Sequence, residues 1–335
     1  MKTKLAPPAL ALAFAFILHP SSFILAQGSL TPPGAPAPTM KTLDQLEPRT
    51  PISSAAFTIS TSGSYYLTGN LTVASGNAIT ISADQVTLDL NGFSISSTAS
   101  PASGTAVLLS SARKNITIKN GHIRGTATFT AGAFTVVGFL NGVSNSSGTS
   151  ANLRVSDLNV LGMASDGINL GFFSVSTYVV ERCNVTVCGA IGIKAGLVRD
   201  CSSDTTGDTA IQADIATNCS GETVNIVAAA FGVIGSSTVE NCRGIAVSGT
   251  GVQGFCVSNS RGTSTSGTGL VGNSAFNCEG FSTSGSFGLS SPLGTASSCR
   301  GKRDGGTAIS AGIAIGCTVN GTGSVSSAQK FLGTP

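Results

Sequence analysis

The chain has 335 residues, of which only 10% are charged, and it contains 43 glycines, 9 cysteines and no tryptophan. Its formal net charge is +3, and Lys2 and Lys4 stand in a segment that we expect to be removed, which leaves about 16 basic and 15 acidic groups. This balance argues against a nucleic-acid partner, because proteins that bind phosphate backbones carry an excess of Lys and Arg.

The first predicted element is a secretory signal peptide over residues 1–26. Lys2 and Lys4 precede an apolar run over residues 9–18, and Ile24-Leu25-Ala26 resembles a signal-peptidase site. No later stretch is apolar and long enough to cross a bilayer. We therefore predict an exported protein, secreted or held at the cell surface, without a transmembrane segment.

Residues 27–54 are predicted to form a Pro-rich arm and an N-terminal cap. Six prolines in residues 32–51 favour an extended backbone. Residues 39–47 are expected to form a short helix, with Thr39 as N-cap and Pro48 as its end.

The clearest strands are predicted in residues 57–95. Runs at residues 63–73, 78–81 and 86–95 alternate apolar and polar residues between turn residues. Residues 116–123 repeat the last of these runs. Residues 124–155 then break the pattern with a Gly/Ser/Thr-rich stretch, which is typical of a surface excursion.

From Val180 to Cys317 the sequence repeats with a period of 18 residues, stretched by short insertions at two places. An aliphatic residue such as Ile193 follows most landmarks of the repeat by ten residues, and a small apolar residue such as Val198 precedes each by three. Leu158 is expected to occupy the landmark column one coil earlier. The landmarks themselves are seven cysteines and Ser260: Cys183, Cys201, Cys219, Cys242, Ser260, Cys278, Cys299 and Cys317.

This repeat predicts the fold. Helical repeats are longer, and the Ser, Thr, Gly and Val between the landmarks suit short strands. We predict an all-β protein, a single-stranded right-handed parallel β-helix over residues 55–321 with about 18 residues in a coil and 11 or 12 coils. Residues 322–335 are predicted to form a C-terminal cap or tail.

The strand runs also carry a family resemblance. The segments "GSYYLTGNLTV", "ITISADQVTLDLNGFSI" and "ITIKNGHIRG" resemble the first coils of secreted right-handed parallel β-helix proteins of the pectate-lyase-like superfamily. The resemblance implies coils over residues 52–320. The superfamily includes polysaccharide lyases, glycoside hydrolases, phage tailspikes and adhesins, so a polysaccharide or cell-surface glycan is the implied partner, without one defined reaction.

Most cysteines are expected to be free, buried thiols, because seven of the nine occupy one column and behave as small apolar side chains. Adjacent coils lie within disulfide range, so pairing between coils is the alternative. Cys188 and Cys256 lie outside the column, and the spacings match no zinc site.

The candidate ligand-binding residues flank the landmarks. Asn241 and Asn259 belong to a column of asparagines directly before the landmarks, in which stacked amides are expected to bond along the axis as turn support or, alternatively, to contact a ligand. Arg243, Arg261 and Arg300 stand directly after the landmarks. Like charges on adjacent strands repel each other, and an acidic sugar would relieve this repulsion.

A solvated charged edge is the alternative to this binding surface. Glu279 stands in the arginine column and is expected to pair with its neighbours. Glu181 is likewise expected to face Arg199 one coil further on.

Asp204, Asp208 and Glu222 are the candidates for a calcium site, and no other cofactor is expected. Asp204 and Glu222 are expected in one column on neighbouring coils, and carboxylates suit calcium; the alternative is that these are solvated turn residues. A glycoside hydrolase needs paired carboxylates, whereas the acidic residues are scattered and the lone His122 is expected to be structural. We predict a non-catalytic polysaccharide-binding or structural surface module, with a polysaccharide lyase or glycoside hydrolase as the alternative.

Overall fold

The computed structural model describes residues 48–147, 149–171, 177–226, 230–303 and 305–331. The predicted signal peptide, most of the Pro-rich arm and the helix expected over residues 39–47 lie outside the described residues. Residues 49–335 form one compact unit. Every regular element within the described ranges is a strand, and no helix there has the length and apolar character needed to cross a membrane.

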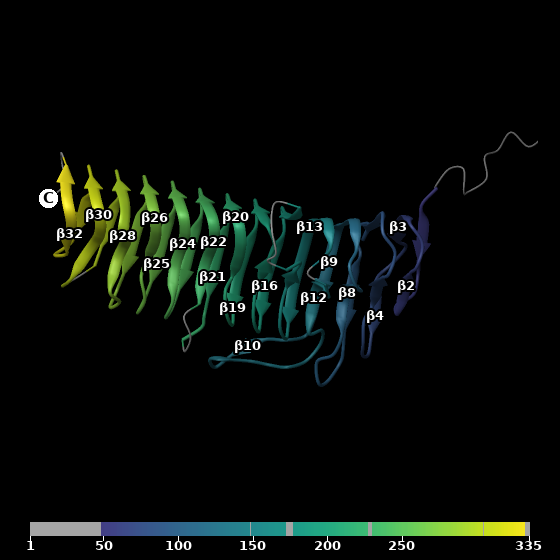
Figure 1. The fold of residues 1–335 in the computed structure, drawn as a ribbon. Helices are drawn as coiled ribbons and strands as arrows, with labels where there is room; N and C mark the ends of the chain where they lie inside the picture. Colours follow the sequence, from purple (N-terminus) through teal and green to yellow (C-terminus); the bar gives the residue numbers. More distant parts are fainter. Residues whose placement is uncertain (1–47, 148, 172–176, 227–229, 304, 332–335) are drawn as a thin grey trace, which may run out of the picture. The chain divides into compact units, whose positions relative to one another are not determined.

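The strands form a parallel β-helix of about 12 turns, as predicted. Figure 1 shows the coils stacked side by side along one axis. Most coils contribute strand backbone to each of three parallel ladders, which we call faces A, B and C. In one coil these strands are β15 (Tyr178–Glu181), β16 (Asn184–Cys188) and β17 (Ile193–Lys194).

The other strands follow the same order. In the early coils, face A contains β1 (Thr50–Ile52), β3 (Gly63–Leu67) and β6 (Val86–Asp89). Face B contains β4 (Leu71–Val73) and β7 (Ser94–Ser97). Face C contains β2 (Phe57–Ile59), β5 (Ile79–Ile81), β8 (Thr105–Leu109), β12 (Asn141–Asn145) and β14 (Ile168–Asn169). Two strands run from face A to face B, namely β9 (Lys114–Arg124) and β13 (Ala151–Met163). β18 (Leu197–Arg199) belongs to face A, and face B continues with β19 (Ser202–Thr206), β21 (Ser220–Thr223), β23 (Arg243–Ala246), β25 (Arg261–Ser264), β27 (Glu279–Ser282), β29 (Arg300–Lys302) and β31 (Thr318–Asn320). Strands that run from face C to face A are β20 (Ile211–Thr217), β22 (Phe231–Glu240), β24 (Thr250–Ser258), β26 (Leu270–Phe276), β28 (Phe287–Ser297), β30 (Thr307–Ile315) and β32 (Ser324–Phe331).

Coil length differs between the two halves of the helix. Val180 pairs with Val198 and Arg199 with Glu181, a step of 18 residues. Farther towards the N-terminus, β9 pairs with β13 at a step of 37 residues, as between Asn115 and Asn152. The mean is about 21 residues, so the predicted length of 18 holds for several of the later coils, whereas most of the early coils are longer.

Strand pairing extends over more residues than the predicted strand runs. It begins at Thr50 and ends at Phe331. The expected runs over residues 63–73 and 86–95 each divide into two strands, because each run crosses a corner of the coil. Asn91, with φ of 53°, makes the second of these corners.

Residues 124–155 contain the expected excursion. β10 (Phe129–Thr130) and β11 (Ala133–Phe134) form an antiparallel hairpin, and the rings of Phe129 and Phe134 lie 4.7 Å apart between centroids. Figure 1 shows this hairpin outside the stacked coils. The chain then returns to face C in β12.

The predicted inward columns form the core. The register confirms Leu158 in the landmark column, because Val155 pairs with Val180 and Asn159 with Asn184. Both other columns are almost fully buried: Val180, Val198, Ala216, Val239, Val257, Ala275, Ala296 and Ala314, and Ile193, Ile211, Val252, Leu270 and Ile309. Stacking of like residues therefore buries the apolar side of each coil.

Faces B and C approach each other closely where glycines follow the landmarks. A Cβ on Gly262 would lie 2.0 Å from the carbonyl oxygen of Gly269, much closer than real Cβ atoms approach other atoms. The same close approach recurs at the equivalent glycines Gly221, Gly244, Gly280 and Gly301. At these five positions the interior has room for backbone but not for a side chain.

None of the nine cysteines forms a disulfide, and eight of them are buried: the seven of the landmark column, as expected, and Cys188. The Cys219 Sγ donates to the carbonyl oxygen of Thr217 at 3.1 Å, and the Ser260 Oγ does the same to Ser258 at 2.7 Å. Serine thus replaces cysteine at this position because both close the corner with the same hydrogen bond.

We expect one thiol, Cys256, to react with Ellman's reagent in the native protein and the other eight only after unfolding. Cys256 is exposed, whereas burial excludes the reagent from the others and raises the pKa of Cys188 to about 12, which removes its reactive thiolate. Counting released thiolate before and after adding guanidinium checks this. More than one fast thiol, or fewer than nine in total without reductant, would contradict it.

Candidate binding groove

Faces A and B meet at a tight corner, which we call the A–B corner. One residue in each coil makes the turn with a left-handed backbone, a conformation that Asn and Asp adopt more readily than most other residues. The residues of this column, with φ between 48° and 60°, are Asn120, Asp157, Arg182, Asp200, Asn218, Asn241, Asn259, Asn277, Ser298 and Gly316. The asparagines of the repeat are thus explained first by backbone conformation.

The side chains of this column bond along the axis, as predicted. The Asn241 amide donates to Asn218 at 3.2 Å, and Asn218 donates to Asp200 at 3.0 Å. Asn277 donates to Asn259 at 2.8 Å. All of these side chains are exposed, so the ladder supports the turns and also presents polar groups to solvent.

A groove with a volume of about 1210 Å³ follows the A–B corner from Arg182 to Thr318. The corner column crosses eight coils between Arg182 and Gly316, which corresponds to roughly 34 Å at about 4.8 Å per step. All five predicted ligand-binding residues line this groove: Asn241, Arg243, Asn259, Arg261 and Arg300. The structure thus brings them together, and their role in binding stays a prediction.

The groove carries more positive than negative charge. Four arginines and two carboxylates line it, which gives a net charge of +2. The arginine column is in register as expected, with Arg243 beside Arg261 and Arg261 beside Glu279. Arg261 Nε lies 3.4 Å from the Glu279 carboxylate, so the expected pairing of Glu279 with the column is also confirmed.

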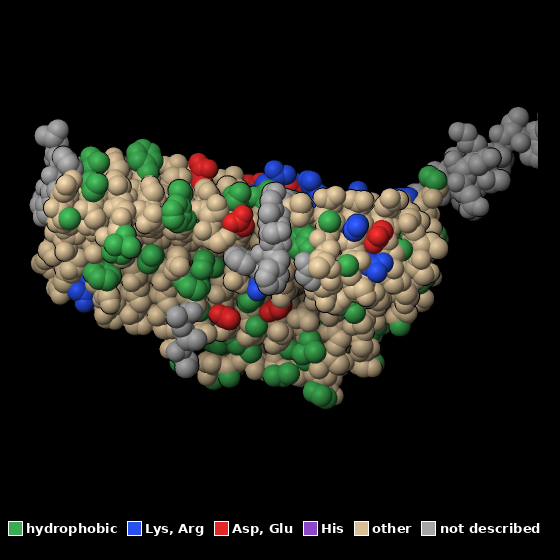
Figure 2. All heavy atoms as spheres, viewed as in Figure 1, with side chains coloured by type: hydrophobic (Ala, Val, Ile, Leu, Met, Phe, Trp, Pro, Cys, Tyr) green, Lys and Arg blue, Asp and Glu red, His purple; other side chains and the backbone are tan. Residues whose placement is uncertain are grey.

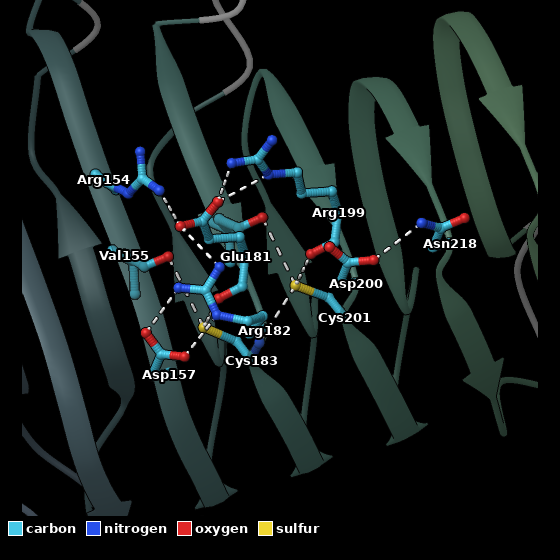
Figure 3. Close-up of polar contacts among 11 residues, drawn as sticks. Arg154, Val155, Asp157, Glu181, Arg182, Cys183, Arg199, Asp200, Cys201 and Asn218 are labelled. Atoms are coloured by element: carbon cyan, nitrogen blue, oxygen red, sulfur yellow. Dashed lines mark hydrogen bonds and ion pairs between the residues drawn. The ribbon is translucent and has the colours of Figure 1, made fainter.

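A denser cluster of charges lies at the N-terminal end of the groove. Glu181 is fully buried and is contacted by Arg154 and Arg199 from the coils on either side, with Arg199 Nε 2.7 Å from the carboxylate. Arg182 extends from the corner to Asp157, with two hydrogen bonds of 2.7 and 2.9 Å, and also reaches Glu181. Figure 3 shows the three guanidinium groups converging on the two carboxylates.

The expected pair of Glu181 and Arg199 is therefore confirmed, but it belongs to a larger network that the sequence did not reveal. Arg154 lies 27 residues before Glu181, outside the 18-residue period. An insertion before Cys183 hides this neighbour from the repeat. Figure 2 shows Arg, Lys, Asp and Glu side chains gathered on the upper edge of the middle coils. It is the same edge of the β-helix at which the arrows of β22 to β30 end in Figure 1.

Both carboxylates of this cluster stay ionised to low pH. The hydrogen bond from Arg182 holds the pKa of Asp157 below its usual value, against the effect of burial. Burial raises the pKa of Glu181, but hydrogen bonds from Arg199 and Arg154 outweigh it, and the pKa lies below the usual value. The cluster is a structural ion-pair network in which each carboxylate is matched by at least one arginine.

The strand ladder does not pair the calcium candidates Asp204 and Glu222 residue to residue. The register between β19 and β21 shifts between Ser203 and Thr206, where Thr205 has φ of 54°. The Asp208 carboxylate instead accepts a hydrogen bond from the neighbouring Thr209 hydroxyl. Within the described ranges no group of three or more His, Cys, Asp or Glu is arranged to hold a metal, and the calcium site stays a prediction.

His122 lies in a smaller depression next to the groove, about 190 Å³ in volume. Its register partner Asn159 pairs in turn with Asn184, and Asn184 lines both the depression and the groove. The column that carries the arginines therefore continues towards the N-terminus as His122 and polar amides.

The comparisons with known proteins give no family for the chain. No family model matches the sequence, and no curated protein matches it. Among solved structures, the A-module of a mannuronan C-5 epimerase from Azotobacter vinelandii is similar with a TM-score of 0.33 and 13% identity, over 78% of this chain and 67% of that chain. Tailspike protein 2 of an Escherichia coli O157:H7 bacteriophage is similar with a TM-score of 0.19 and 10% identity, over 86% of this chain and 38% of that chain. Similarity at this level carries no argument about function, which has to come from the groove.

Proposed function

We propose that this protein is an exported binding module whose groove at the A–B corner holds an acidic polysaccharide. The observation that carries the proposal is the groove itself, which extends over eight coils and has a net charge of +2. Arginines bind carboxylates with charge-assisted hydrogen bonds, and the exposed amides of the ladder suit sugar hydroxyl groups. The signal peptide predicted over residues 1–26 supports export.

The positions of the carboxylates favour binding over hydrolysis. Asp200 and Glu279 stand four coils apart in the groove, about 19 Å, whereas the two carboxylates of a glycosidase lie roughly 5 to 9.5 Å apart. In the cluster at the end of the groove, Glu181 is buried and the pKa of Asp157 is lowered, the opposite of what a general acid needs. A polysaccharide lyase or glycoside hydrolase remains the alternative function.

Replacing Arg243 and Arg300 together with alanine is expected to weaken binding of an acidic polysaccharide by about tenfold or more, since each lost charge-assisted contact is worth about 1 kcal/mol. Affinity electrophoresis of the purified mature protein in gels containing acidic or neutral polysaccharides measures this. The matched control is Lys114→Ala with Arg124→Ala, which removes the same charge at exposed positions of β9 outside the groove.

The same incubations distinguish the two functions. Release of reducing ends or unsaturated products, with or without calcium, would establish the enzyme instead. Equal retardation of both double variants would place binding outside the groove, and no retardation of the wild-type protein by any acidic polymer would refute the proposal.

A further inference from the structure

The positive charge of the groove is unevenly distributed along its axis. Arg243 and Arg300 are exposed, and among the described residues neither forms an ion pair. They are separated by the coils of Arg261 and Glu279, so three steps of about 4.8 Å place them roughly 14 Å apart.

The two residues between them neutralise each other. The Arg261 guanidinium is engaged by the Glu279 carboxylate at 3.4 Å, and the Glu279 side chain is still 33% exposed to the groove. A ligand carboxylate at this point would meet a like charge and an arginine that is already paired. Along the arginine column, a ligand therefore meets a cation at Arg243, then the neutral pair of Arg261 and Glu279, and then a second cation at Arg300.

The rest of the groove continues this pattern of sparse charge. Towards the N-terminus the column before Arg243 consists of Ser220, Ser202 and Asn184, which are uncharged hydrogen-bonding groups. After Arg300 the column ends on Thr318. Such residues match neutral sugar hydroxyls and not a continuous row of acid groups.

We propose that the groove selects an acidic heteropolysaccharide, in which neutral sugars separate the charged ones, over a homopolymer with an acid group on every sugar, and that Glu279 determines this selectivity. The inference rests on the proposed function, since it concerns which acidic polymer the same groove takes. A homopolymer with an acid group on every sugar has to place a carboxylate opposite Glu279, which repels it. A heteropolysaccharide can place a neutral sugar opposite Glu279 instead.

The test compares two carboxylate polymers of equal length at one ionic strength: polygalacturonate, charged on every sugar, and hyaluronate, charged on every second sugar. Wild-type protein is expected to bind hyaluronate at least about threefold more tightly. Glu279→Gln removes the repulsion and releases Arg261, so it should tighten binding of polygalacturonate by about threefold or more and change that of hyaluronate less. Glu222→Gln, the same substitution on face B outside the groove, is the control, with chelator present throughout.

The outcomes separate the two proposals. If neither polymer binds and the broader panel of acidic polysaccharides also fails, the proposed function is wrong. If polygalacturonate binds as tightly as hyaluronate and Glu279→Gln acts no differently from Glu222→Gln, the groove binds acidic polymers without this selectivity and the inference is wrong. Unchanged urea midpoints of both variants establish that the fold is intact.

Discussion

The Glu181→Ala variant is expected to lose about 3 kcal/mol of its free energy of unfolding, at the low end of the range for a broken buried ion pair. Glu181 is fully buried, and its carboxylate is the shared partner of Arg154, Arg182 and Arg199. Its removal takes the counter-charge from Arg154 and Arg199 and leaves Arg182 paired with Asp157 alone, with the three guanidinium groups still close together. Those groups are about half exposed, and water screens part of the repulsion, which keeps the loss near the low end.

Urea unfolding of the variant against the wild-type protein measures this loss. Arg154→Ala is the matched control, since it removes one exposed partner and should cost about 1 kcal/mol or less. A Glu181→Ala loss no greater than that of Arg154→Ala would show that the cluster does not act as a buried ion pair.

The pH dependence has a defined sign. The folded pKa of Glu181 lies below its ordinary value of 4.5, so its stabilising contribution is complete above that value and is lost as the pH falls through the lower folded pKa. The stability of wild-type protein should therefore fall below about pH 4.5 more steeply than that of Glu181→Ala.

Replacing Gly262 with alanine is expected to cost about 3 kcal/mol or more, and valine at this position should prevent folding of the later coils. The new Cβ would lie 2.0 Å from the carbonyl oxygen of Gly269, and backbone on face C cannot move without disturbing the coils on both sides. Each coil contacts only its neighbours, so the strain cannot be spread over a large core.

Gly69→Ala is the control, because a Cβ there meets nothing within 4 Å and the backbone is not left-handed. It should change the free energy of unfolding, measured in urea, by less than about 0.5 kcal/mol. Equal, small effects at the two positions would contradict the close approach of faces B and C.

The repeat was sufficient to predict the fold, the inward columns and the order of residues along the groove. A constant step of 18 residues sets which side chains are neighbours, so the positions of Arg243, Arg261 and Glu279 relative to one another followed from counting. The same reasoning failed where the step changes. Arg154 was missed as a partner of Glu181, and the length of the early coils was underestimated.

Local backbone geometry is the other feature that spacing does not reveal. The bulge between Ser203 and Thr206 interrupts the residue-by-residue pairing of Asp204 with Glu222, and no side-chain pattern predicts it. A glycine stands two residues after five of the eight landmarks in the sequence, but its reason is a contact with another face of the solenoid. Spacing along the chain identifies neighbours on one face and does not measure the distance between faces.

The repeated A–B corner makes the length of the groove a quantity that changes in whole steps. The segment Asn241–Ser258 is one complete coil, and its excision would join Glu240 to Asn259, which has the same left-handed backbone as Asn241. The binding surface would become shorter by one step of about 4.8 Å and would lose Arg243, while every remaining corner kept its geometry. Duplication of the same segment would add one step and one arginine. Gain or loss of whole coils in the gene would therefore change the length and the net charge of the groove, while the contacts within each remaining coil stayed the same.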